Sequence, residues 1–122
     1  MKTTLNPPAA LIETLYAAFN RRDIDAVLAK LHPDVVWPNG WEGGVVSGHA
    51  AVRDYWTRQW AAIDPSVTPQ RITVAPGGAV SVDVHQVVRD LEGRVLSDGA
   101  VTHVYAFDDG LVTAMWILPP QA

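Results

Sequence analysis

The chain of 122 residues contains no cysteine. This absence excludes disulfide frameworks, thiolate zinc sites and cysteine nucleophiles, and because it suits a reducing compartment we expect a cytoplasmic protein. Basic residues are also scarce, since nine Lys and Arg stand against 13 Asp and Glu, a formal net charge of −4. Nucleic-acid binding relies on a basic surface, so this balance predicts no nucleic-acid partner.

Long apolar runs are missing as well. No run approaches the roughly 18 residues that a membrane span needs, and the N-terminus lacks the apolar core of a signal peptide, so we expect no membrane partner. Internal repeats, linkers and low-complexity segments are absent too, which predicts a single domain over residues 1–122. A chain of this length buries about two-thirds of its unfolded surface, enough for one core without a metal.

Tryptophan, in contrast, is abundant, with five residues in the chain. Trp37, Trp41, Trp56 and Trp60 fall in one short stretch, and Trp116 stands alone near the C-terminus. So many indoles indicate either a large core or the lining of a ligand cavity. Both interpretations remain open for the group, although the core is the more common place for any single indole.

The first half of the sequence has helical periodicity. Apolar residues recur at helical spacing over 11–19 and again over 24–31, where Asp23 is placed to cap a second, short helix. A short strand is expected over 35–37, and a loop or short edge strand over 43–48. A third helix is predicted over 49–63, because apolar residues again share one face and Asp64-Pro65 ends the segment.

The second half changes to the period of strands. Segments 67–75, 79–90, 94–107 and 111–118 are predicted strands, and valines alternate strictly with polar residues in the second of them. Pro69 suits an edge position for the first. Helices followed by a meander of strands predict an α+β fold.

Two glycine-containing turns predict how the last three strands pair. A three-residue loop over 91–93 pairs Asp90 with Arg94, and one over 108–110 pairs Phe107 with Leu111. Extended along the strands, this register predicts one sheet face with Ser81, Asp83, His85, Val101, His103, Met115 and Ile117. It predicts the opposite face with Val80, Val82, Val84, Thr102, Val104 and Trp116.

The first of these faces mixes polar and apolar side chains, which suits a half-dry cavity between sheet and helices. On it Asp83, His85 and His103 form an acid–base cluster: a carboxylate that orients one imidazole nitrogen leaves the other free as a base. A structural hydrogen bond is the alternative interpretation. A two-His-one-carboxylate metal site is conceivable, but the spacing does not demand it, and we predict no metal and no cofactor. The valine-rich face predicts cover by a second subunit.

Four segments together resemble a known superfamily. They are LYAAFNRRDID at 15–25, HPDVVW at 32–37, GHAAVRDYW at 48–56 and HVYAFDDGLV at 103–112. This pattern resembles the nuclear transport factor two-like superfamily, above all its SnoaL-like polyketide cyclase and ketosteroid-isomerase-like branches. The resemblance implies a cone-shaped barrel, in which a curved mixed sheet wraps around N-terminal helices in a cystatin-like roll. It also implies an apolar cavity, small apolar ligands and a homodimer through the outer sheet face.

The catalytic residues of the superfamily are only partly present. Steroid isomerases use a tyrosine on the first helix, whose place Leu15 takes with Tyr16 beside it. Their aspartate base falls at Asn39, which cannot abstract a proton, and their second acid falls at His103 or Thr102. The isomerase trio is therefore not intact.

The cyclase branch uses a sheet histidine and an aspartate on the final strand. His103 matches that histidine, but Ile117 stands at the aspartate's position, which leaves the base unassigned. Two functions remain open: a cofactor-free isomerase, cyclase or hydratase acting on a small apolar or cyclic substrate, or a non-catalytic ligand-binding or accessory domain.

The candidate catalytic residues are His103 or His85 as base and Asp83 as the group that orients it. The candidate substrate-binding residues are Tyr16, Trp37, Asn39, Trp56, Trp60, Val101, Met115 and Ile117. Trp41 is expected in a mobile lid or a dimer contact, and Trp116 in the dimer interface.

Overall fold

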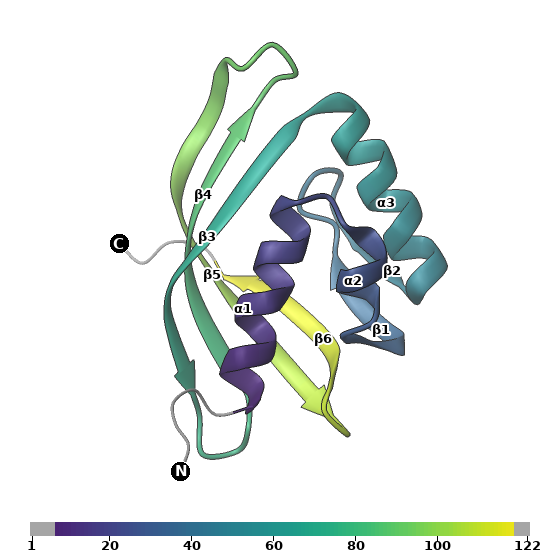
Figure 1. The fold of residues 1–122 in the computed structure, drawn as a ribbon, viewed down its shortest axis with the longest axis vertical. Coiled ribbons are helices and arrows are strands. Elements are labelled where there is room, and N and C mark those ends of the chain that lie inside the picture. The colour runs from purple at the N-terminus through teal and green to yellow at the C-terminus, as the bar shows by residue number, and fades with distance from the viewer. Residues whose placement is uncertain (1–6, 119–122) are drawn as a thin grey trace.

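The computed structural model describes residues 7–118, which form one curved sheet with all helices on its concave side (Figure 1). The helices are α1 (Pro7–Asn20), α2 (Ile24–Leu28) and α3 (His49–Ala62). The strands are β1 (Leu31–Pro38), β2 (Val45–Ser47), β3 (Asp64–Val74), β4 (Val80–Arg89), β5 (Val95–Asp108) and β6 (Leu111–Leu118).

The sheet has the order β2-β1-β6-β5-β4-β3, and β1 pairs with β6 in parallel while the other pairs are antiparallel. The predicted α+β class, with a curved mixed sheet around the helices, is confirmed. Since β2 and β3 are edges, the sheet does not close into a complete barrel. Within residues 7–118, no helix has the length and apolar character that crossing a membrane requires.

The second helix is shorter than predicted. It ends at Leu28, and Leu31 begins β1, where it is buried opposite Val112 of β6. Pro33 therefore lies inside a strand, in the irregular stretch between the Leu31 and Val36 pairings. A residue without an N–H fits there, because the ladder is already interrupted.

The turn between β4 and β5 forms as predicted, but the register beyond it does not. Asp90 N–H donates to the Arg94 carbonyl at 2.8 Å, which closes the three-residue loop. Arg89 then faces Val95 while Val88 faces Ser97, so Leu96 is an extra residue in a β-bulge. The bulge shifts all later pairs by one residue, so the predicted register of β4 on β5 is wrong.

The hairpin between β5 and β6 differs from the prediction twice. Its loop has two residues, Asp109 and Gly110, both with positive φ (55° and 79°), as a type I′ turn requires. A second bulge places Thr113 between the Val112 and Ala114 pairings. The two one-residue differences add up to an even number, so His103, now opposite Ile117, stays on the predicted face with Met115.

The valines of β4 consequently belong to the core rather than to a subunit interface. Val80, Val82 and Val84 are all buried in the cluster that joins sheet and helices. The face of β4 that was predicted to line the cavity, with Asp83 and His85, is the outer one. The prediction that a second subunit covers these valines is therefore wrong, because the helices of the same chain cover them.

Asn20 fixes the end of α1 against the sheet. Its side-chain amide donates to the Val67 carbonyl at 2.7 Å, and its Oδ1 accepts from Val67 N–H at 3.0 Å. The side chain thus satisfies both backbone groups of a residue on the edge strand β3, in the way that a neighbouring strand would. This contact holds α1 across the concave face, where its inward side chains meet β5.

Candidate functional site

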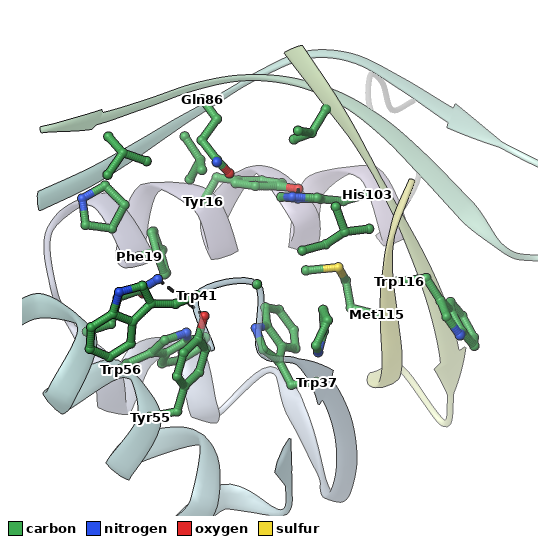
Figure 2. A pocket seen from close by; sticks show the side chains of 18 of the residues that line it. Tyr16, Phe19, Trp37, Trp41, Tyr55, Trp56, Gln86, His103, Met115 and Trp116 are labelled. Carbon is green, nitrogen blue, oxygen red and sulfur yellow. Dashed lines mark hydrogen bonds between the residues drawn. The ribbon is translucent and has the colours of Figure 1, made fainter. Parts of the chain in front are cut away.

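A cavity of about 840 Å³ lies between the concave face of the sheet, helices α1 and α3, and the loop that follows β1. Figure 2 shows side chains converging on it from these elements. The lining is mostly apolar and rich in aromatic residues, including Tyr16, Trp37, Trp41, Tyr55, Trp56 and Tyr105. Tyr16 and Tyr105 are buried, whereas Val36, Val45 and Ile117 are exposed, so the cavity has a closed inner end and an open mouth.

The aromatic wall is a continuous cluster. Trp56 packs edge-on against Trp37, with ring centres 5.5 Å apart, and edge-on against Phe19 at 5.6 Å. Behind it Trp60 stacks on Trp56, with ring centres 5.8 Å apart. The Arg22 guanidinium lies over the Trp60 ring, 5.0 Å from its centre. Trp56 therefore belongs to the cavity wall and to the core at once.

The closed end of the cavity holds three linked polar side chains. The Tyr105 hydroxyl donates to Tyr16 Oη at 2.7 Å, and Tyr16 Oη lies 2.6 Å from His103 Nδ1. The rings of Tyr16 and His103 are also nearly parallel, at an interplanar angle of 9°. Residues from α1 and β5 thus meet in one short hydrogen-bonded chain.

The direction of this chain follows from the burial of Tyr105. Its hydroxyl is fully buried and has no other partner in the described part of the chain, so its proton has to go to Tyr16 Oη. The Tyr16 proton is then donated to His103 Nδ1, which must be the unprotonated nitrogen of a neutral ring. The tautomer with its proton on Nε2 follows.

His103 Nε2–H is consequently a donor in the cavity. Over residues 7–118 it has no hydrogen-bond partner. It is nevertheless not sealed from solvent, because among these residues the buried side-chain atom without a partner is Trp60 Nε1. Nε2 is thus open to a ligand in the cavity that His103 lines.

Burial keeps all three groups uncharged. It lowers the pKa of His103 from 6.5 to about 4, and it raises the pKa values of Tyr16 and Tyr105 above their usual range. For Tyr16 the neighbouring Tyr105 adds to the increase. Within residues 7–118, no Asp, Glu, Lys or Arg lines the cavity. The inner end is therefore neutral near pH 7.

Most of the predicted substrate-binding residues do line the cavity. They are Tyr16, Trp37, Trp56, Val101, Met115 and Ile117, together with His103. Trp60 lies behind Trp56, outside the lining. Asn39 is also outside it: its Oδ1 accepts the N–H groups of Trp41 and Glu42 at 3.1 and 2.6 Å, and so it folds the loop.

The predicted acid–base cluster does not form. His85 Nε2 lies 2.6 Å from Asp98 Oδ1, and Asp83 accepts a hydrogen bond from the Thr102 hydroxyl at 3.2 Å, all on the outer face of the sheet. The Leu96 bulge is the physical reason, because it turns both side chains away from His103. Across residues 7–118, no three His, Asp or Glu side chains are close enough to hold a metal ion.

Two side chains of the site were missed by the sequence analysis. Tyr105 follows His103 by two residues, so strand alternation alone could have placed it on the same face. Tyr55 lines the cavity from α3, and its hydroxyl accepts a hydrogen bond from the Gln59 amide at 3.3 Å. Trp41 lies in the cavity lining and is 38% exposed.

Comparison with solved structures gives close likenesses over almost the whole chain. TerC, crystallised with polyporic acid, is 27% identical, with a TM-score of 0.81 over 93% of this chain and 91% of its own. A putative polyketide cyclase from Xanthomonas campestris pv. campestris is 24% identical, with a TM-score of 0.74 over 91% and 88%. RV0760c from Mycobacterium tuberculosis, in complex with estradiol-17β-hemisuccinate, is 19% identical, with a TM-score of 0.78 over 91% and 92%.

The comparison with curated proteins gives no match. The model of the SnoaL-like domain family matches residues 12–115, which include every strand and helix except the first turns of α1 and the end of β6. The resemblance to SnoaL-like proteins found in the sequence is thereby confirmed, and the chain belongs to the SnoaL-like domain family.

Proposed function

We propose that this protein binds a small, largely apolar cyclic molecule in the cavity and anchors it through a hydrogen bond from His103 Nε2. The observation that carries this proposal is an unpaired N–H donor at the inner end of a neutral, aromatic cavity. Apolar walls with a few placed polar groups are typical of small-molecule sites. The ligands crystallised with TerC and with RV0760c are ring compounds that bear oxygen, which supports the same ligand class here.

The donor role favours binding over acid–base catalysis. Because Nδ1 accepts from Tyr16 and Nε2 carries the proton, neutral His103 has no free lone pair with which to act as a base. No carboxylate in the lining takes that role among residues 7–118. Of the two functions left open by the sequence, the non-catalytic ligand-binding one is therefore better supported. The imidazole N–H would polarise a bound carbonyl.

The test compares ligand affinities of two histidine variants. Binding of polyporic acid and of estradiol-17β-hemisuccinate is measured by quenching of tryptophan fluorescence. We expect His103→Leu to bind about tenfold more weakly than the wild type, because one buried hydrogen bond is lost. His85→Leu is the matched control on the outer face and should bind as the wild type does. Equal affinities of His103→Leu and wild type would contradict the anchoring role.

A homodimer through the outer sheet face is a further proposal about the same protein. It is supported by Trp116, which is 51% exposed and pairs with Val104 on β5. Sedimentation analysis should give twice the chain mass for the wild type and the single chain mass for Trp116→Glu, since a charge there opposes burial. A monomeric wild type at micromolar concentration would exclude the dimer. The cytoplasmic location stays a prediction.

A further inference from the structure

The cavity lining also has polar side chains away from His103, among them Gln59, Gln86 and Ser97. Gln86 of β4 lies in the lining and is partly buried, and its side chain points from the sheet into the pocket (Figure 2). Among the described residues its amide has no hydrogen-bond partner, unlike Gln59, whose amide donates to Tyr55 Oη at 3.3 Å. An amide that is half removed from water and unpaired is available to a ligand.

The register of β4 and β5 gives the separation of the two polar groups. Gln86 faces Gly99, and His103 faces Val82, so four residue steps lie between them along the strands. At about 3.3 Å per residue this is about 13 Å. Val84 and Val101 face each other in between and supply an apolar floor. The sheet thus presents a polar, an apolar and a second polar zone in line.

Gly99 leaves space beside Gln86. Gly99, Val101 and His103 are two residues apart along β5, so Gly99 shares the concave face with the other two. Any residue other than glycine would place a side chain in this space. A Cβ built on Gly99 meets no atom within 4 Å. Glycine inside a strand often marks the close approach of a ligand. The Gln86 amide is therefore open from the side of its neighbouring strand.

We propose that Gln86 and Gly99 form a distal subsite for the second polar group of an elongated ring ligand whose first acceptor is held by His103. This inference rests on the proposed function. Since an amide both donates and accepts, the subsite takes a hydroxyl or a carbonyl, and it discriminates ligands that have polar atoms at both ends from ligands that have one. Gln86 is thus a specificity-determining residue, and Gly99 makes it reachable.

The experiment uses a matched pair of probes, estradiol and 17-deoxyestradiol, which share the ring system and differ in one terminal oxygen. Affinities are measured by tryptophan quenching for the wild type and for Gln86→Leu. We expect Gln86→Leu to lose about three- to tenfold in affinity for estradiol and nothing for 17-deoxyestradiol, because only estradiol engages both ends. Gln70→Leu, an exposed glutamine on β3, is the matched control.

A second variant tests the open space. Gly99→Val adds a side chain that suits a strand, strains no backbone and has a Cβ that meets no existing atom, so the protein should fold, as far-UV circular dichroism would verify. It should weaken estradiol at least as much as Gln86→Leu does and leave the binding of phenol unchanged. Estradiol binding that is unaffected by both variants overturns the distal subsite.

The remaining outcomes separate this inference from the proposed function. If phenol binds in a His103-dependent manner and neither steroid binds, the distal subsite is wrong and the His103 anchor stands. If the steroids bind with a Gln86 effect and no His103 effect, the distal subsite stands and the anchor is wrong. If phenol and both steroids fail to bind the wild type, both are overturned.

Discussion

Replacing Trp56 with alanine is expected to lower the free energy of unfolding by about 4 kcal/mol, as large-to-small aromatic substitutions in cores do. The side chain is 1% exposed, and its ring contacts Trp37, Phe19 and Trp60. The loss removes these contacts and joins the vacated volume to the cavity. Because domains are typically stable by about 5–15 kcal/mol, the variant should lose a large fraction of its stability. Urea unfolding followed by far-UV circular dichroism measures the change.

Trp41→Ala is the matched control for this substitution. Trp41 also lines the cavity, but it is 38% exposed and lies in the loop that follows β1. We expect it to cost less than about 1 kcal/mol, as partly exposed loop substitutions do. If Trp56→Ala proves no more destabilising than Trp41→Ala, the aromatic cluster is a cavity wall only and contributes little to the core.

The sequence was sufficient for the elements and the fold class because both depend on local signals. Periodicity located α3 and the four long strands within a few residues, and Pro69 was correctly assigned to an edge strand. The second helix was overextended because Leu31 continues its apolar spacing. Its burial against β6 is a tertiary contact that periodicity does not contain.

The site was harder to predict because its assembly depends on register. The loop over 91–93 was correct, yet one extra residue at Leu96 reversed both faces of β4 and removed Asp83 and His85 from the site. In the next hairpin two unforeseen one-residue shifts preserved the face of His103. These bulges were not visible in the turn residues or in the hydrophobic alternation. Counting residues from the loops therefore gives the right face only where the undetected one-residue shifts add up to an even number.

The partners of His103 were also outside the reach of the sequence. Tyr16 is 87 positions away in the chain, and its contact with His103 exists because α1 crosses the concave face near β5. Tyr16 was identified as a binding residue from the family resemblance and the aromatic content, without a named partner. The hydrogen bond gives it a specific role, which is to keep the proton of His103 on Nε2.

That buried histidine should make the stability of the protein depend on pH. Its pKa is lowered by burial to about 4 in the folded protein, against 6.5 in the unfolded chain. Between these values the unfolded chain binds the proton and the folded protein does not, so stability falls as pH decreases from about 7 to about 4. This difference corresponds to about 3 kcal/mol, since one pKa unit is worth about 1.4 kcal/mol.

The contribution of His103 is isolated by comparison with His103→Asn, whose amide oxygen can accept from Tyr16 but does not titrate. His32, His49, His85 and the carboxylates remain in both proteins, so their effects cancel in the difference. The free energy of unfolding, measured with urea at intervals between pH 7 and pH 4, should decrease by about 3 kcal/mol more in the wild type than in the variant. Parallel curves would mean that His103 is protonated as readily in the folded protein as in the unfolded chain. Burial would then not hold the ring in its neutral form below about pH 6.5, and the explanation that burial keeps the closed end of the cavity uncharged would be wrong for His103.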